Sequence, residues 1–194
     1  MNRQAFLYYF QHARQVGKEP DYPLNRTGRP AAVLIPLIER GEGLSLLLTE
    51  RAHHLRHHPG QISFPGGAVE ESDETIIAAA LRETQEETGI SSDYIHVIGT
   101  MPDYRTISGY TIKPVIAFVT PGFTLKIDAN EVASVFEVPF AHVMDKKNHL
   151  VHYTHRDKNR FPIYFIPYKD KMIWGATAAM LRNLSHHLDI SHHQ

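Results

Sequence analysis

The sequence of 194 residues contains no cysteine, which excludes disulfides and thiolate metal sites and fits a reducing cytoplasm. No segment approaches the roughly 20 apolar residues of a membrane span, and the first residues contain no apolar core of a signal peptide. The formal net charge is −1, so no excess of positive charge attracts nucleic acid or an anionic membrane. We therefore expect a cytoplasmic globular protein that binds neither of these partners.

Hydrophobic residues make up 42% of the chain, which is enough for a buried core and argues against disorder. The distribution of apolar residues, proline and glycine predicts three parts. An N-terminal helix and a linker occupy 1–28, one domain occupies 29–189, and a polar tail occupies 190–194.

Short apolar runs alternate with helical patterns along the predicted domain. The runs predict strands at 31–39, 44–50, 62–64, 94–101, 111–120 and 132–140, and a hairpin of 149–155 with 161–168. Helices are predicted at 4–15, 74–88 and 173–188, and 103–110 is predicted to be a loop. Pro36 cannot donate to a sheet ladder, which favours an edge strand or a bulge in the first strand. Such a mixture is typical of an α/β or α+β sandwich.

The stretch LRETQEETGI, from Leu81 to Ile90, gathers three carboxylates on one side of the predicted helix. Glu83, Glu86 and Glu87 are spaced i, i+3 and i+4, where like charges repel. Divalent cations remove this repulsion, and oxygen ligands at this density suit Mg²⁺ or Mn²⁺. Arg82 is placed to orient one of these carboxylates. The alternative is a solvated acidic surface that does no chemistry.

The longer stretch GGAVEESDETIIAAALRETQEETGI resembles the Nudix box, whose pattern is G-x5-E-x7-R-E-U-x-E-E-x-G-U, where U is apolar. The chain departs from this pattern in two ways. Thr84 occupies an apolar position, and the loop is one residue too long. Counting forward from Gly67 makes Asp73 the first carboxylate of the box, whereas counting back from Arg82 makes it Glu74, so the sequence leaves this choice open.

The resemblance implies a Nudix α/β/α sandwich with a mixed central sheet and a loop–helix–loop motif. It implies hydrolysis of a nucleoside diphosphate linked to a second group, with Mg²⁺ or Mn²⁺ as cofactor. The residues that the resemblance assigns to metal binding are Glu83, Glu86, Glu87 and the backbone at Gly67. Those that it assigns to catalysis are Glu83, Glu86 and Glu131. The alternative for Glu131 is an ordinary carboxylate of a surface loop.

The preceding segment, LLLTERAHHLRHHPGQISFPGG at 46–67, resembles the signature L-L-T-x-R-x-x-x-L-R-x-H-x-G-Q-x-x-F-P-G-G of the coenzyme A diphosphatase branch of this family. This likeness implies that coenzyme A (CoA) or acyl-CoA is cleaved to 3′,5′-ADP and 4′-phosphopantetheine or its acylated form. It implies substrate binding by Arg51, Arg56, His58 and Gln61, through phosphate forks and hydrogen bonds. In the alternative, the two arginines pair with nearby carboxylates and hold the loop.

Two other functions stay open at this stage. One is a Nudix hydrolase of ADP-ribose, NADH or a nucleoside triphosphate, and the other is a catalytically silent domain that binds a nucleotide or CoA as a sensor. In each case the partner is a small molecule, and by analogy with the fold a homodimer is allowed.

The histidines invite a different metal site. Those at 53, 54, 57 and 58 have the i,i+4 spacing that can chelate zinc on a helix. Pro59-Gly60 closes the stretch and no cysteine or clear carboxylate accompanies it, so we expect no zinc there. Trp174 is predicted to begin the last helix, where packing is favoured over stacking on an adenine.

Overall fold

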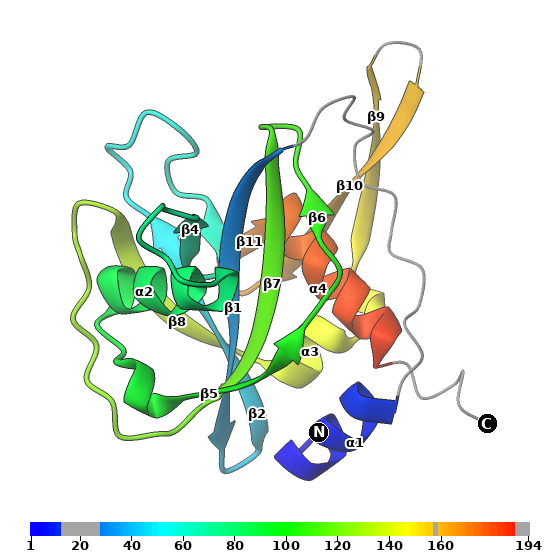
Figure 1. Ribbon diagram of the computed structural model, residues 1–194. Helices are drawn as coiled ribbons and strands as arrows, with labels where there is room; N and C mark the ends of the chain where they lie inside the picture. Colours follow the sequence, from blue (N-terminus) through cyan, green and yellow to red (C-terminus); the bar gives the residue numbers. More distant parts are fainter. Residues whose placement is uncertain (13–27, 157–158, 189–194) are drawn as a thin grey trace.

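The computed structural model describes residues 1–12, 28–156 and 159–188 (Figure 1). Eight strands form one mixed sheet: β1 Arg29–Arg40, β2 Gly43–Arg51, β3 Ile62–Ser63, β4 Gly66–Ala68, β5 Ile95–Thr100, β6 Tyr104–Arg105, β7 Tyr110–Val119 and β8 Val132–Pro139. The central path of the sheet runs β3-β2-β1-β7-β5. Outside that path, β4 pairs with β1, β6 with β7 and β8 with β2.

The parallel pair β1 and β7 lies at the centre of this sheet. Its two faces are both buried, which explains why both strands read as nearly unbroken apolar runs. Leu34 and Val115 belong to the core cluster that also contains residues of α2 (Ile76–Thr88), whereas Ile35 and Ile116 belong to the cluster on the opposite face. Each strand therefore contributes alternate side chains to two cores.

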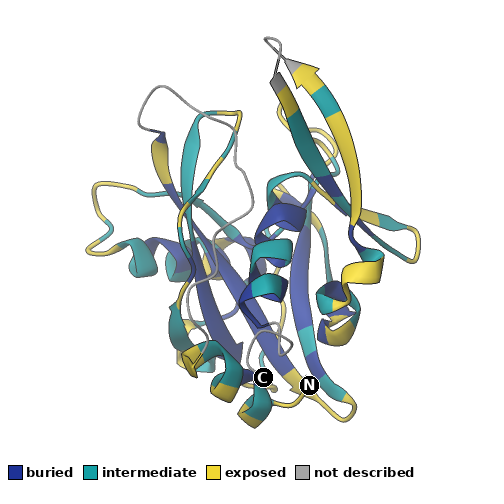
Figure 2. Ribbon diagram, turned by 90° about the vertical axis from the view of Figure 1, so that its right-hand side faces the viewer, coloured by how far each residue is buried: buried dark blue, intermediate teal, exposed yellow. Residues whose placement is uncertain are grey.

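Helix α2 covers one face of the sheet (Figure 1). The opposite face is covered by α1 (Arg3–His12), α3 (Phe140–Met144), α4 (Ala176–His187) and a second sheet of β9 (Leu150–Arg156), β10 (Asn159–Tyr168) and β11 (Lys171–Trp174). Figure 2 shows the buried residues between these layers. Two short 3-10 helices, Ser92–Tyr94 and Lys146–Asn148, complete the described elements. The layers confirm the predicted mixed α/β sandwich.

The N-terminal helix α1 belongs to the same core as the rest of the chain. Its Phe6 is fully buried. The ring of Phe6 meets the edges of Phe118 at 5.7 Å and Phe140 at 5.6 Å between centroids. The helix extends to His12, and the remainder of the predicted 4–15 helix, at 13–15, lies outside the described residues.

The prediction that Pro36 marks an edge strand or a bulge was wrong. β1 is an interior strand, and Pro36 lies opposite Ala117 of β7. On its other side, β1 pairs with β4 through Val33 and with β2 only from Leu37 onward. On this side of β1, Pro36 therefore lies in the gap between the residues that pair with β4 and those that pair with β2. No neighbouring strand there requires the amide hydrogen that proline lacks.

The last helix begins later than predicted. Lys171–Trp174 forms β11, which places Ile173 in the core, and α4 starts at Ala176. Gly175 separates them with φ 66°, in the left-handed region that favours glycine. Trp174 is thus on a strand, where its ring stacks on Phe165 at 6.3 Å between centroids.

Two short strands were also missed. β4 follows Pro65 and pairs with β1, and β6 lies within the predicted loop at 103–110 and pairs with β7. Such strands are too short for an alternating pattern, so they form through their neighbours. None of the helices in the described ranges is long and apolar enough to cross a membrane.

Candidate active site

Helix α2 is defined by local signals at both ends. The Thr75 hydroxyl accepts a hydrogen bond from the amide of Ala78 at 3.0 Å, which caps the N-terminus. At the other end, Gly89 adopts φ 76° and donates its amide hydrogen to the carbonyl of Gln85 at 2.8 Å. The helix therefore runs from Ile76 to Thr88, close to the predicted 74–88, and it carries all the carboxylates of the acidic stretch.

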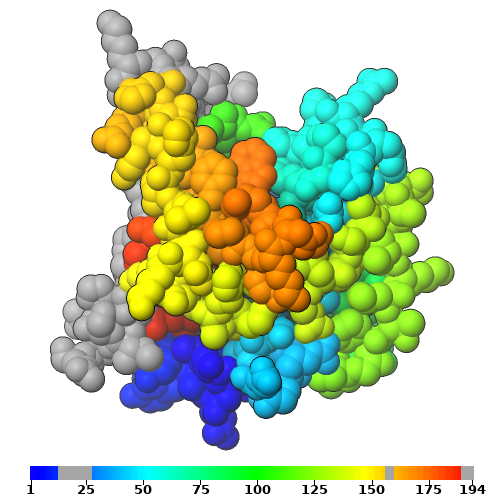
Figure 3. Space-filling view, turned by 180° about the vertical axis from the view of Figure 1, so that it is seen from behind, coloured from blue at the N-terminus to red at the C-terminus, as the bar shows by residue number. Residues whose placement is uncertain are grey.

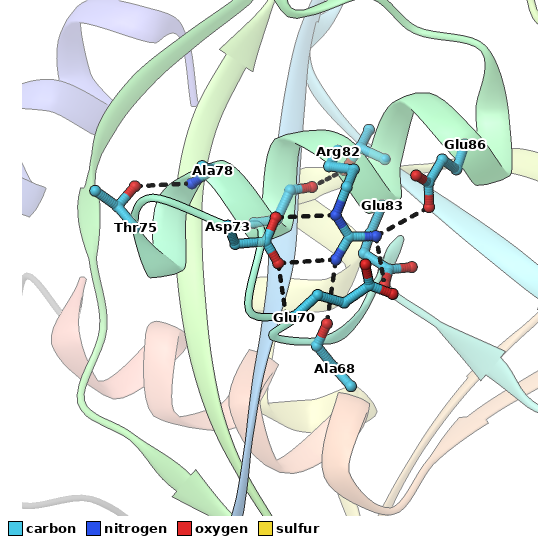
Figure 4. A network of polar contacts seen from close by, with 10 residues as sticks. Ala68, Glu70, Asp73, Thr75, Ala78, Arg82, Glu83 and Glu86 are labelled. Carbon is cyan, nitrogen blue, oxygen red and sulfur yellow. Dashed lines mark hydrogen bonds and ion pairs between the residues drawn. The ribbon is translucent and has the colours of Figure 1, made fainter.

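Arg82 is the centre of a polar network at the start of the acidic stretch (Figure 4). Its guanidinium binds Asp73 through two hydrogen bonds, Nε–Oδ1 at 2.9 Å and Nη2–Oδ2 at 3.0 Å. Nη1 donates to Glu83 at 3.1 Å and Glu86 at 3.0 Å, and Nη2 donates to the carbonyl of Ala68 at 3.2 Å. Arg82 thus joins helix α2 to β4 and to the loop between them.

The network shows which of the two candidate loop carboxylates contacts Arg82. Asp73 accepts the fork of Arg82 and also the amide of Glu70 at 2.8 Å. The hydrogen bond from Arg82 holds the pKa of Asp73 below its ordinary value, and the same contact raises the pKa of Arg82. Glu74 is exposed, so Asp73 is the carboxylate that this loop directs toward the helix.

Glu83 and Glu86 differ in exposure although they share Arg82. The Glu83 side chain is 14% exposed and the Glu86 side chain is 59% exposed. Burial raises the pKa of Glu83, and the hydrogen bond from Arg82 opposes that shift. A Cβ atom on Gly67 would lie 2.5 Å from the Glu83 carboxylate, so the two residues are in close contact. Glu83 therefore packs directly on the backbone of β4.

Glu87 is buried, which the sequence did not predict. It is 4% exposed, and its carboxylate accepts a hydrogen bond from the amide of Gly66 at 3.3 Å. The pKa of Glu87 is raised to about 8, and loss of solvent is the largest cause. The charges of Glu83 and Glu131 also raise this pKa, whereas the Gly66 hydrogen bond and the charge of Arg51 lower it.

Glu131 and Arg51 reach this site from distant segments. Their charges act on Glu87, and the charge of Glu131 also raises the pKa of Glu83. The amide of Ala52, next to Arg51, donates to the carbonyl of Glu131 at 2.8 Å. The backbone therefore holds the end of β2 against the loop before β8, and both predicted residues lie near the acidic helix.

The rest of the predicted substrate-binding segment lies further out. Arg56 and His58 are exposed, and within the described residues no hydrogen bond or ion pair joins either one to the carboxylates of α2. His58 has φ 55°, an uncommon conformation for a residue other than glycine. Gln61 returns to the sheet: its carbonyl accepts the amide of Arg51 at 3.0 Å, and its side-chain nitrogen lies 3.7 Å from the Cβ position of Gly175.

The chemistry of the donors suits a hard cation, although the observed arrangement does not bring three of them together. Glu83, Glu86 and Glu87 provide carboxylate oxygens, the close approach at Gly67 leaves no room for a side chain, and burial of Glu87 favours a nearby positive charge. In the arrangement observed, Glu83 and Glu86 bind Arg82. Among the described residues, no group of three or more histidines, aspartates and glutamates is disposed to hold a metal ion.

Two contacts near this site were missed from the sequence. The first is the Gly66 amide on Glu87, for which the Gly66-Gly67 pair was the available signal. The second joins Glu50 to Lys171 at 2.8 Å, across 121 residues of sequence, and no local pattern predicts it. His53, one of the histidines considered for zinc, lies 3.4 Å from this same glutamate.

Comparison with known proteins identifies the family. The NUDIX domain model matches residues 28–157. The chain is 40% identical over 183 residues to the protein named uncharacterized Nudix hydrolase NudL from Shigella flexneri serotype 5b, covering 93% of this chain and 91% of that protein. The protein of the same name from Escherichia coli O1:K1 is 39% identical over the same coverage.

A solved structure agrees with this result. The Nudix hydrolase RenU from M. smegmatis is 28% identical, with a TM-score of 0.51, and the match covers 60% of this chain and 74% of that one. The chain belongs to the Nudix hydrolase family. It is a pyrophosphohydrolase of nucleoside diphosphate derivatives, and α2 with its flanking loops forms the segment that resembles the Nudix box.

Proposed function

We propose that this protein hydrolyses the diphosphate of CoA or acyl-CoA, giving 3′,5′-ADP and 4′-phosphopantetheine or its acylated form. The observation that carries this proposal is the convergence of the segment 46–67 with the acidic helix. Arg51 ends β2 near the buried Glu87, and Ala52 binds the backbone of Glu131. A cationic fork beside several carboxylates is the combination that a diphosphate with a divalent cation requires.

In this proposal, Glu83, Glu86 and Glu87, with the carbonyl of Gly67, would hold Mg²⁺ or Mn²⁺. A bound cation of this kind neutralises charge on phosphate oxygens and lowers the pKa of water. Asp73 keeps Arg82 engaged, so that the guanidinium orients Glu83 and Glu86 and does not turn to the substrate.

The chain's own residues perform the remaining steps. Arg51 donates to a phosphate oxygen of the diphosphate, and Arg56, His58 and Gln61 contact the rest of the substrate. Glu131 accepts a proton from the attacking water, with Glu83 and Glu86 as the other carboxylates at the reacting phosphorus. Attack forms one P–O bond, the bridging P–O bond breaks, and the departing phosphate takes the bridging oxygen.

A substrate panel tests the proposal. The protein is incubated with CoA, dephospho-CoA, ADP-ribose and NADH, each with Mg²⁺ or Mn²⁺, and the products are separated by chromatography. We expect 3′,5′-ADP from CoA and a slower reaction with dephospho-CoA, because the latter lacks the 3′-phosphate. The Glu87→Gln variant serves as the inactive control, and Arg40→Met serves as a control for surface substitution.

The outcomes separate the alternatives. No 3′,5′-ADP above the Glu87→Gln control would refute hydrolysis of CoA. Faster turnover of ADP-ribose or NADH would identify a hydrolase of another nucleoside diphosphate derivative. Tight binding of CoA without turnover of any substrate would indicate a sensor.

A further inference from the structure

Glu50 is the meeting point of three separate segments at the end of β2. Its Oε2 accepts hydrogen bonds from Lys171 Nζ of β11 and from the Ser134 hydroxyl of β8, both at 2.8 Å. Its Oε1 lies 3.4 Å from Nε2 of His53, which belongs to the loop 52–61. The Glu50 side chain is 18% exposed and the Lys171 side chain is 24% exposed. This contact is therefore partly shielded from solvent, where ion pairs have more effect than on an open surface.

The charges of this cluster support one another. The hydrogen bond from Lys171 holds the pKa of Glu50 below its ordinary value, against the opposing effect of burial. The Lys171 ammonium also lies 4.9 Å from the centre of the Phe136 ring, a cation–π contact on β8. Figure 3 shows the β10–β11 surface beside the segment that follows β2, as the contact between Lys171 and Glu50 requires.

Glu50 and Arg51 are consecutive residues that serve opposite faces of the sheet. Leu46 and Leu48 belong to the core cluster under β10, β11 and α4, whereas Leu47 belongs to a cluster with Ile90 after α2. Alternation along the strand therefore directs Glu50 toward β11 and Arg51 toward the acidic helix. The pairing of β2 with β8 shifts register between these two residues. The extra residue is Ala133 of β8, between Val132 opposite Arg51 and Ser134 opposite Glu50, so the bulge lies on β8 and β2 keeps its alternation.

The backbone of Arg51 connects this cluster to the site. The amide of Arg51 donates to Gln61 at 3.0 Å, and its carbonyl accepts the amide of Gly60 at 3.1 Å. The next residue, Ala52, donates to the carbonyl of Glu131 at 2.8 Å. A displacement of Glu50 would therefore move Arg51 and both ends of the loop 52–61, and it would weaken the hydrogen bond from Ala52 to Glu131.

We propose that Lys171 and Glu50 are a positioning pair: Lys171 holds Glu50 on the far face of the sheet, and Glu50 thereby fixes the end of β2 that presents Arg51 to the substrate diphosphate. This inference rests on the proposed role of Arg51 in substrate binding. It assigns a function in the site to a residue of the second sheet, and neither residue of the pair touches the substrate.

The first test is a kinetic comparison of Lys171→Met, Lys171→Arg and Glu50→Gln with the parent protein, using the fastest substrate of the panel. We expect Lys171→Met to raise KM about tenfold with kcat within about twofold, because a misplaced binding group weakens substrate binding. Lys171→Arg keeps the charge and should restore most of the affinity. Glu50→Gln removes the negative charge that Lys171 binds and should raise KM in the same way. It takes the place of Lys171→Met in the comparison if Lys171→Met fails to fold.

The matched control is Arg40→Met. Arg40, the last residue of β1, makes a comparable ion pair with Glu137 of β8, with Nε–Oε2 at 3.0 Å. This pair does not include Glu50 or Lys171. Its loss should leave KM unchanged. A double-mutant cycle then tests the route: in an Arg51→Ala background, Lys171→Met should change KM by less than about twofold, because the group that it positions is already absent.

A second measurement needs no substrate. Amide hydrogen exchange at Ala52 and Gly60 should accelerate about tenfold in Lys171→Met and stay unchanged in Arg40→Met, since these amides close the loop through Arg51 and Glu131. Unchanged KM and exchange in Lys171→Met would overturn the inference, and so would effects of Lys171→Met and Arg51→Ala on KM that simply add. Failure of CoA hydrolysis with accelerated exchange would instead overturn the proposed substrate alone.

Discussion

Replacing Gly67 with alanine should disable the site and leave the fold intact. A Cβ atom there would lie 2.5 Å from Cδ and Oε1 and 2.6 Å from Oε2 of Glu83. Ordinary contact begins at 3.4 Å, so the carboxylate must retreat by about 0.9 Å. A displacement of about 1 Å can reduce a rate about 100-fold, which corresponds to about 2.7 kcal/mol of activation free energy.

The cost to the fold should be much smaller. Gly67 does not have a left-handed φ, so alanine suits its backbone. The clashing atoms are the end of a flexible, partly exposed side chain, which can rotate at about 1 kcal/mol or less of unfolding free energy. Gly66→Ala should behave differently. Gly66 has φ 151°, and its Cβ would meet the backbone of Val33 at 2.6 Å, so that variant should lose stability as well as activity.

The assay compares kcat and KM with the fastest substrate, together with thermal unfolding, for Gly67→Ala, Gly66→Ala and Gly41→Ala. Within the part of the chain that the structure describes, Gly41 has nothing within 4 Å of its Cβ position, so it serves as the neutral control. We expect a large loss of kcat in Gly67→Ala with a melting temperature within a few degrees of the parent. Activity of Gly67→Ala within about twofold of the parent would refute the idea that contact between Gly67 and Glu83 matters to catalysis.

Three further predictions concern the charged groups. Asp73→Asn weakens the fork to Arg82 and should reduce kcat about tenfold or more, whereas Glu74→Gln should match the parent in the same assay. With a chelator present, the free energy of unfolding should fall as pH rises from about 4.5 to about 8, because folded Glu87 retains its proton while the unfolded carboxyl releases it. Over this pH range the free energy of unfolding should fall by an amount on the order of 3–5 kcal/mol. Urea unfolding of Glu87→Gln should show no such dependence on pH. Burial lowers the pKa of His149, so the parent should lose stability as pH falls below about 6.5. His149→Gln should lose less stability over the same range. Equal slopes of unfolding free energy against pH between pH 5 and 7 for the two proteins would contradict this.

His149 illustrates why that sign is expected. Its Nε2 donates to the carbonyl of Val143 at 2.8 Å, and its Nδ1 is buried with no hydrogen-bond partner among the described residues. Protonation would place a charge at Nδ1, where the charges of Arg182 and His186 also disfavour it. The unfolded chain meets no such penalty, so acid favours unfolding.

The acidic helix was predictable because its signals are local. Thr75 and Gly89 set its ends within two residues of the predicted bounds, through contacts that span at most four residues. The family and the mixed sandwich followed from sequence for a related reason. A motif at fixed spacing and alternating apolar runs are properties of short stretches of chain.

The errors occurred where long-range pairing overrides local preference. Pro36 is unfavourable in a generic interior strand, yet it fits between the neighbours β4 and β2, whose positions arise only in the assembled sheet. Trp174 continues an apolar helical pattern into α4, but pairing with Phe165 makes it part of a strand. The choice between Asp73 and Glu74 could not be made by counting, because the loop length allows both and only the position of Arg82 separates them.

The sequence by itself determined the class of this protein: a helix with three clustered carboxylates, an arginine just before them and a glycine at its end, preceded by the segment 46–67. Tertiary structure alone decided how those groups differ. It buried Glu87 and left Glu86 in solvent, and it brought Arg51 and Glu131 to the same carboxylates. It also placed Lys171 on Glu50 from 121 residues away. Spacing encodes which side chains share a helix face, whereas burial and distant ion pairs exist only after the sheet has assembled.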